Sequence, residues 1–378
     1  MQIAQTGWAE GDPFSGWRAN IGAFSDSSVI PSDGTELASL DWIARNVALC
    51  TDGRTVELGG VLPHEQELAR WCLFFFRSNQ IFMEYTTANE AKASFDDVYN
   101  APTPHGYLQT MDGLGYRIGD HAKPFFEKTL GHMRASNPDQ YQPRFLDLGC
   151  SYGIGSALLI HGCSYQSLSE FFLRQPDRDF ENCVSATQNW LDGRSIRSDA
   201  ECVGLDQAAN AVRFGERTGL LARGIVSNLE EGDRLSSDEE SSIRRCNILI
   251  STGAIGYVGP KTLGPILRLL GKATPENVGP LIVATVLRMF DPALIQECFR
   301  EHGFAFEKVS DKPLPQRNFE SEEEQADTID LLKKRGISTA GLEETGVLYA
   351  DVYAGAREPD FSDFATTLES VAHTTATE

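Results

Sequence analysis

The sequence lacks any cysteine pattern that would indicate a zinc site or a disulfide framework. Its eight cysteines are scattered, with no CxxC pair and no His/Cys spacing of the kind that zinc sites use. Reduced thiols behave as small apolar residues, so we expect most of these cysteines in the core. The sequence therefore predicts no metal site and a reducing compartment.

Long hydrophobic runs are absent as well. No window approaches the roughly 18 consecutive apolar residues that a membrane span needs. The first residues, MQIAQTGWAEGDPFSGW, have neither the basic start nor the apolar segment of a secretory signal. These two absences predict a cytoplasmic protein with no membrane role.

Positive charge is scarce. There are 33 Lys and Arg residues against 54 Asp and Glu residues, which gives a formal net charge of −21. Such a chain repels nucleic-acid phosphates and anionic lipid headgroups, so the charge disfavours nucleic-acid and membrane-surface functions. The hydrophobic share of 41% and the charged share of 23% are those of an ordinary globular protein.

Residues 1–140 are predicted to form a mainly helical extension and lid. The first 35 residues are rich in Gly, Ser and Asp, which predicts loops, and two helical patterns follow, ELASLDWIARNVALC and PHEQELARWCLFFFRSNQIFMEY. The second pattern contains Phe74, Phe75 and Phe76, which suit a core or a subunit interface such as that of a homodimer. Pro102 and Pro104 then interrupt any helix before GDHAKPFFEKTLGHM, which is again helical.

Strand and helix patterns alternate over residues 141–356. The apolar runs RFLDLG, ECVGLDQ, ARGIVSNL, RCNILIST and GPLIVATVL are each followed by a helical or polar stretch. This order predicts an α/β domain with a parallel sheet that helices cover on both faces. Residues 163–200 exceed a normal connection and predict a helical insertion, and residues 357–378 predict a polar, partly disordered tail.

The stretch LDLGCSYGIGS is a strand that ends in a glycine-rich turn. Asp147 and Gly149 end the strand, and Gly153 stands at the mouth of the next helix. Glycines allow the backbone to approach a ligand closely, and free amides at a helix start can bind it. The spacing differs from the GxGxxG pattern of dinucleotide-binding proteins, so an NAD-dependent oxidoreductase is disfavoured.

This stretch resembles the first motif of class I S-adenosylmethionine-dependent methyltransferases, an acid-x-Gly-x-Gly-x-Gly pattern in which Ser151 replaces the middle glycine. The resemblance covers about residues 144–356. It implies a Rossmann-like, mostly parallel sheet of about seven strands with helices on both faces. It also implies that S-adenosylmethionine is the cofactor and that the turn binds its methionine part through Asp147, Gly149, Cys150, Ser151 and Gly153.

Asp206 ends the second predicted strand, where the same family has an acid that binds both ribose hydroxyls. A carboxylate accepts two hydroxyl hydrogens and repels a ribose phosphate, which favours an adenosyl ligand over NADP. Gln207 follows it and joins the expected cofactor site. The alternative is that Asp206 caps the next helix.

Asn228 and Leu229 follow the third predicted strand, at the place where the family often reads adenine. An amide or acid there, Asn228 or Glu230, can accept a hydrogen bond from the exocyclic amine. A polar surface loop is the equally good alternative.

The fourth predicted strand runs into the loop STGAIGYVG. Ligands of open α/β sheets bind at the carboxyl ends of the strands, so Ser251 and Thr252 are expected at the cofactor and Ser251 and Tyr257 at the reacting atoms. Alternatively, Ser251 and Thr252 bond backbone amides while Tyr257 packs.

Polar aromatic residues of the lid form the remaining candidates. Tyrosine faces attract a sulfonium or a protonated amine, and histidines such as His105 or His121 can remove a proton. Each residue alone is more often a packing or surface residue. The expected catalytic residues are Tyr99, His105 and Tyr107, and the expected substrate-binding residues are Asn100, Tyr116, Tyr152 and Tyr257.

Together these features predict a methyltransferase for a small amine, amino acid or phenol, active by in-line displacement at the sulfonium methyl. One alternative keeps the cofactor but transfers or cyclises its aminocarboxypropyl group, as azetidine-2-carboxylate synthases do, and releases methylthioadenosine. A second alternative is a non-enzymatic binding or regulatory protein of the same fold.

Overall fold

The computed structural model describes residues 96–136, 142–175, 179–192, 194, 197, 199–270 and 279–374. All of them belong to the unit Gln80–Glu378. The loop-rich start, the two helical patterns that follow it and the cluster Phe74–Phe76 lie outside the described residues.

An eight-stranded sheet forms the centre of this unit, in the order β3-β2-β1-β4-β5-β8-β6, with β7 paired to β8. The five strands from β3 to β5 are parallel, and β8 is antiparallel to β5, β6 and β7. The predicted Rossmann-like fold is thereby confirmed. The strands are β1 (Arg144–Leu148), β2 (Glu201–Asp206), β3 (Arg223–Val226), β4 (Ile248–Thr252), β5 (Leu281–Leu287), β6 (Phe304–Lys308), β7 (Leu314–Asn318) and β8 (Val347–Arg357).

Helices cover both faces of the sheet because alternate residues of each buried strand point to opposite sides. Phe145 of β1 joins the apolar cluster of α6 and α15, whereas its neighbour Leu146 joins that of α12 and α13. The helices before the first strand are α4 (Asp96–Tyr99), α5 (His105–Gly113) and α6 (Ile118–Ser136). The later ones are α7 (Ile154–Leu159), α8 (Tyr165–Leu173), α9 (Phe180–Asp192), α10 (Ala209–Thr218), α11 (Ser237–Arg244), α12 (Pro260–Leu270), α13 (Ala293–Glu301), α14 (Glu322–Lys334) and α15 (Glu358–Thr374), with the short 3-10 helices η1 (Leu229–Glu231) and η2 (Glu343–Thr345).

Local sequence signals explain where several helices begin. Ser164 and Ser167 form a capping box at the start of α8, and Ser236 and Glu239 form another at α11. Ser321 caps α14, whose first turn is acidic and whose last turn is basic, as the helix dipole favours. Helices α8 and α9 occupy the long insertion between β1 and β2.

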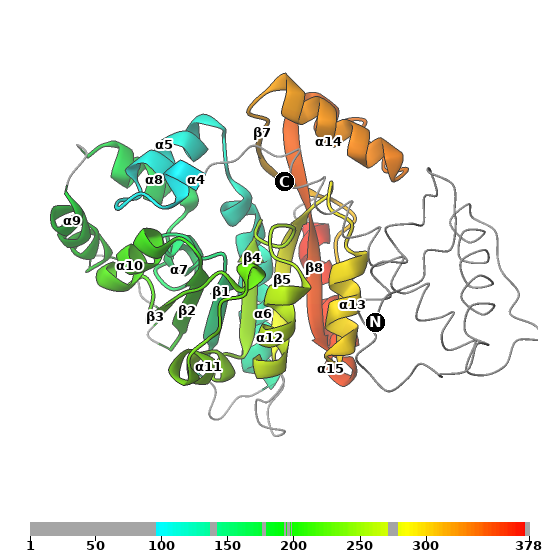
Figure 1. Cartoon of the computed structure of the whole chain (residues 1–378). Coiled ribbons are helices and arrows are strands. Elements are labelled where there is room, and N and C mark those ends of the chain that lie inside the picture. Colours follow the sequence, from blue (N-terminus) through cyan, green and yellow to red (C-terminus); the bar gives the residue numbers. More distant parts are fainter. Residues whose placement is uncertain are drawn as a thin grey trace, which may run out of the picture. The chain divides into compact units, whose positions relative to one another are not determined.

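Helices α4, α5 and α8 gather at one end of the sheet, and β7 and α14 extend beyond the sheet at that end (Figure 1). The order of the parallel strands reverses between β1 and β4, and the carboxyl ends of strands beside such a reversal form the usual ligand crevice of open α/β sheets. The fold therefore directs attention to the ends of β1, β2 and β4.

Two features differ from the expectations. The sheet has eight strands rather than about seven, because the short β7 pairs with the start of β8. The prediction of a partly disordered tail was wrong up to residue 374, because α15 packs Phe364, Leu368 and Val371 into the cluster of α6. Its apolar residues recur at a helical spacing, so this face is buried although the segment is polar on average.

Candidate functional site

The turn after β1 needs glycine at two positions. Gly149 has a φ of +78°, and a Cβ there would lie 2.5 Å from the Cβ of Ala254, in the loop after β4. At Gly155, a Cβ would lie 2.4 Å from Oδ2 of Asp147. Ser151, the residue that replaces the expected glycine, also has a left-handed backbone, with a φ of +48°. Ser151 therefore adopts the left-handed backbone that glycine more often supplies.

A buried carboxylate, Asp147, and a partly buried one, Asp206, stand at the ends of β1 and β2. Asp147 is only 4% exposed, and its Oδ2 has no hydrogen-bond partner among the described residues. Burial and the neighbouring carboxylate of Asp206 raise the pKa of Asp147 to about 7, although the backbone N–H of Gly155 opposes the shift. Burial likewise raises the pKa of Asp206. This end of the sheet is therefore prepared for a ligand that carries positive charge or hydrogen-bond donors.

Asp206 also fastens the turn. The N–H of Ser151 donates to its Oδ2 at 2.8 Å, and the N–H of Ala208 donates to its Oδ1 at 2.9 Å. The bond from Ala208, which directly precedes α10, agrees in part with the alternative that Asp206 caps the next helix. The backbone N–H of Gln207 bonds the same carboxylate. A carboxylate has about four acceptor positions, so about one stays open to a ligand.

Further buried polar atoms without partners lie next to these strand ends. In the described part of the chain, the hydroxyl oxygens of Ser151 and Ser227 have no hydrogen-bond partner. Ser227 directly follows β3, and its N–H donates to the carbonyl of Asp206. Buried polar groups are rarely left unpaired in a native protein, so these atoms favour a bound polar ligand here.

Five tyrosines, which we call the tyrosine cluster, lie together near the carboxylates: Tyr99, Tyr107, Tyr116, Tyr152 and Tyr165. The ring of Tyr107 lies 5.2 Å from that of Tyr99 and 5.7 Å from that of Tyr152, and the rings of Tyr116 and Tyr165 are 5.2 Å apart. Burial raises the pKa of Tyr107 well above its usual value, so its hydroxyl stays protonated. The cluster thus presents protonated hydroxyls and aromatic rings rather than charge.

Contacts tie the cluster to the strand ends. The hydroxyl of Tyr116 is hydrogen bonded to the side chain of Thr252, at the end of β4, and the charge of Asp147 contributes to the raised pKa of Tyr116. The hydroxyl of Tyr152, within the glycine turn, donates to the carbonyl of Ala101 at 2.8 Å. The structure therefore brings the predicted residues Tyr99, Tyr107, Tyr116 and Tyr152 together with Asp147 and Thr252.

The loop after β3 uses its polar groups internally. Oδ1 of Asn228 accepts from the N–H of Glu231, and its Nδ2 donates to Oε1 of Gln207. Leu229 is buried beside them. Oε1 of Glu230 accepts from the N–H groups of Gly259 and Thr262 and so caps α12. These bonds agree with the alternative that this segment is a polar surface loop. They leave the lone pairs of Asn228 only partly available to adenine.

Ser251 requires a correction. It is 0% exposed, and its hydroxyl donates to the carbonyl of Leu148 at 2.9 Å, which fastens β4 to β1. It is therefore not placed to contact a substrate. Tyr257 lies in the loop before α12 and is 42% exposed. The centre of its ring is 6.2 Å from that of Phe290.

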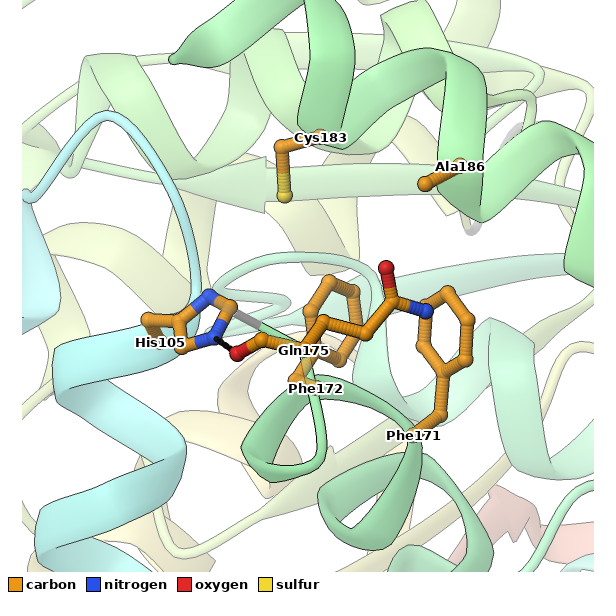
Figure 2. A pocket seen from close by; sticks show the side chains of 6 residues that line it. All are labelled: His105, Phe171, Phe172, Gln175, Cys183 and Ala186. Atoms are coloured by element: carbon orange, nitrogen blue, oxygen red, sulfur yellow. Dashed lines mark hydrogen bonds between the residues drawn. The ribbon is translucent and has the colours of Figure 1, made fainter. Parts of the chain in front are cut away.

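His105 and Asn100 are occupied by structural contacts. Nε2 of His105 bonds the carbonyl of Gln175 at 2.9 Å, and its ring borders a small pocket between α5, α8 and α9 (Figure 2). Phe171, Phe172, Cys183 and Ala186 also line this pocket, which no residue of the glycine turn borders. Oδ1 of Asn100 accepts from the N–H of Asn210 and so attaches the lid to α10. Neither geometry favours the expected roles in catalysis and substrate binding.

Sequence reasoning missed two polar residues at this site. Tyr165 lies in the insertion, and its hydroxyl is buried with no hydrogen-bond partner in the described ranges. Gln316 belongs to the unexpected strand β7, and its Oε1 is also buried with no hydrogen-bond partner among the described residues. The length of the connection predicted a helical insertion but not the position of Tyr165, and no sequence signal marked Gln316.

The described residues contain no group of three or more His, Cys, Asp or Glu side chains that could hold a metal ion. The six described cysteines are buried free thiols, as predicted, while Cys50 and Cys72 lie outside the described residues. None of the described helices combines the length and the hydropathy needed to cross a membrane.

No family model and no curated protein matches the chain. Among solved structures, it is similar to magnesium protoporphyrin IX methyltransferase from Synechocystis PCC 6803 with bound SAM, at 9% identity over 61% of this chain and 79% of that one, with a TM-score of 0.29. A TehB-like SAM-dependent methyltransferase from Corynebacterium glutamicum is 13% identical over 62% and 98% of the two chains, with a TM-score of 0.28.

An O-methyltransferase from a trans-AT PKS multienzyme of Brevibacillus brevis, in complex with S-adenosyl-L-homocysteine, is 10% identical over 67% of this chain and 78% of that one, with a TM-score of 0.29. At such low identities and TM-scores, the fold is assigned from the strand order of the chain itself, and any function must be argued from its own site.

Proposed function

We propose that this chain is an S-adenosylmethionine-dependent methyltransferase that acts on a small molecule. The observation that carries the proposal is the pair of carboxylates, the buried Asp147 and the partly buried Asp206, beside a turn with left-handed backbone at Gly149, Ser151 and Gly153. This arrangement stands at the ends of adjacent parallel strands, beside the reversal in strand order.

The unpartnered atoms suit the parts of this cofactor. The open acceptor position of Asp206 fits a ribose hydroxyl, and the unpartnered Oδ2 of Asp147 fits an ammonium group. A ligand phosphate would face both carboxylates, so the site disfavours phosphorylated dinucleotides. When bound, S-adenosylmethionine supplies a methyl group that is already activated on a sulfonium.

The protein's own contribution is then to position the acceptor and to exclude water. The tyrosine cluster is suited to both tasks, because Tyr107, Tyr116 and Tyr165 are buried and their hydroxyls stay protonated. Aromatic faces also attract a sulfonium or a protonated amine. These features support an acceptor of small size, such as an amine, an amino acid or a phenol.

Calorimetry with S-adenosylhomocysteine tests the cofactor part of the proposal. Replacement of Asp206 by Ala removes an ionised acceptor worth about 1.5–3 kcal/mol, so affinity should fall about 10- to 100-fold. Asp311→Asn, which also removes one negative charge but on the exposed surface, is the matched control and should bind like the wild type. No binding by the wild-type protein at millimolar ligand would refute the proposal.

The reaction itself is tested by incubation with S-adenosylmethionine and panels of amines, amino acids and phenols. Methyl transfer should release S-adenosylhomocysteine only when an acceptor is present. Methylthioadenosine formed without any acceptor would instead indicate chemistry at the aminocarboxypropyl group and would refute methyl transfer.

A further inference from the structure

Strand β7 carries a bulge at the point where it passes the site. Its register with β8 shifts between Pro315 and Arg317, so Gln316 is left out of the regular pairing. Such bulges redirect a side chain and occur often beside active sites. The side chain of Gln316 is accordingly turned inward, and the residue is only 4% exposed.

The carboxamide of Gln316 lies against the loop that follows β4. A Cβ built on Gly253 would lie 3.2 Å from Nε2 of Gln316. Gly253 keeps a φ of +76°, and its N–H donates to the hydroxyl of Thr285. In the part of the chain that the structure describes, Oε1 of Gln316 is buried and accepts no hydrogen bond. A buried amide oxygen in this state indicates a missing donor.

The backbone of Gln316 is fixed independently of its side chain. Its carbonyl accepts from the N–H of Arg117 at 2.9 Å, and the N–H of Asn318 donates to the carbonyl of Leu114. These two bonds attach β7 to the connection between α5 and α6, next to Tyr116. Gln316 is therefore held on a rigid strand between the sheet and the lid.

Gln316 stands on the opposite side of the β4 loop from the glycine turn. Gly253 contacts Gln316, while the next residue, Ala254, contacts Gly149 of the turn. On the lid side, Tyr116 is bonded to Thr252, directly before Gly253, and the charge of Arg317 influences the pKa of Tyr116. The loop after β4 thus connects the glycine turn, Gln316 and Tyr116 of the tyrosine cluster through consecutive residues.

We propose that Gln316 is the acceptor-binding residue, whose Oε1 accepts a hydrogen bond from an N–H or O–H on the atom to be methylated. This inference rests on the proposed function and narrows its substrate class. Acceptors that carry such a donor, namely amines and hydroxyl compounds, are selected over acceptors that would be methylated at an apolar carbon. An apolar group there would leave Oε1 buried and unpaired.

Sinefungin provides a probe of the transfer position, because its amine takes the place of the methyl group, next to the acceptor atom, whereas S-adenosylhomocysteine carries no group there. Binding of both compounds is measured by calorimetry for the wild type, Gln316→Met and Gln316→Glu. Gln316→Met keeps the volume but removes the acceptor, so sinefungin affinity should fall about tenfold while S-adenosylhomocysteine affinity stays within about twofold.

The Gln316→Glu variant keeps an acceptor oxygen and adds negative charge. Its preference for sinefungin over S-adenosylhomocysteine should equal or exceed that of the wild type. This comparison is informative even if Gln316→Met does not fold. Asn318→Ala changes an exposed side chain of the same strand and should leave both affinities unchanged.

An unchanged ratio of the two affinities in Gln316→Met would overturn the assignment, as would a preference for sinefungin in Gln316→Glu that falls below that of the wild type. If the wild type binds neither compound, the proposed function fails, and the role of Gln316 fails with it. If the wild type binds both and only the ratio is insensitive to Gln316, the proposed function stands and the role of Gln316 alone is refuted.

Discussion

Replacement of Asp147 by Asn is expected to abolish a specific part of the pH dependence of stability. In the folded protein the pKa of Asp147 is about 7, whereas its ordinary value is 3.8. Between these two values the folded state holds a proton that the unfolded state has lost. Stability from this group is therefore greatest at low pH and is lost as pH rises through about 7.

The size of the effect follows from the two pKa values. From about pH 5 to about pH 7, the wild type loses about 1.4 kcal/mol of unfolding free energy per pH unit, and above this range the loss levels off. Asn has nearly the same shape and does not titrate in this range. The variant should therefore gain about 3 kcal/mol relative to the wild type between about pH 5 and about pH 8.

Urea denaturation of both proteins at these two pH values measures this quantity as a double difference. Titrating groups other than Asp147 and its coupled neighbour Asp206 are common to both proteins and cancel. The Asn side chain leaves one buried polar atom unpaired at every pH, which shifts the variant's stability by a constant amount. A double difference below about 1 kcal/mol would show that Asp147 is not held in a desolvated site beside Asp206.

The remaining predictions concern the charge of Asp147, the glycine turn and the ion pair between Arg317 and Glu324. The affinity for S-adenosylhomocysteine should increase as pH rises from about 5 to about 8, because the ligand's ammonium group favours ionised Asp147. Calorimetry in buffers of different ionisation heat should detect the proton that is released on binding. An affinity that does not depend on pH would contradict this prediction. Gly155→Ala should reduce this affinity at least about tenfold, since its Cβ would displace Asp147, whereas Gly131→Ala, in open space on α6, should be neutral or stabilising by about 0.5–1 kcal/mol. Arg317→Met should lower the unfolding free energy by about 3–5 kcal/mol in urea titrations, because Glu324 would stay buried without the guanidinium that now bonds it at 2.9 Å. The double variant Arg317→Met with Glu324→Leu should recover most of this loss. If it recovers nothing, the ion pair is not the cause of the loss.

The α/β order of this chain could be read from the sequence because it depends on local patterns. Runs such as RFLDL and LIVATVL are mostly apolar, as is typical of strands that are buried on both faces. The meeting of Asp147 and Asp206 could be anticipated for a related reason. The carboxyl ends of adjacent parallel strands share one edge of the sheet, so acids that end two such strands must lie close together.

Side-chain direction could not be read in the same way. Ser251 and Thr252 are neighbours at the end of β4, yet one is sealed against β1 and the other bonds Tyr116 of the lid. Which neighbour faces the crevice depends on the register of β4 with the adjacent strands, and a shift of one residue would exchange their positions. Local sequence does not specify that register.

The sequence thus accounts for the strands, the glycine turn and the two acids, because hydrophobic periodicity and chain order act over short distances. The tertiary structure is needed for the tyrosine cluster and for Gln316. These residues come from segments far apart in the chain, and a bulge in β7 and the contacts of the lid bring them to the same strand ends. Their placement depends on non-local packing, which no short stretch of sequence encodes.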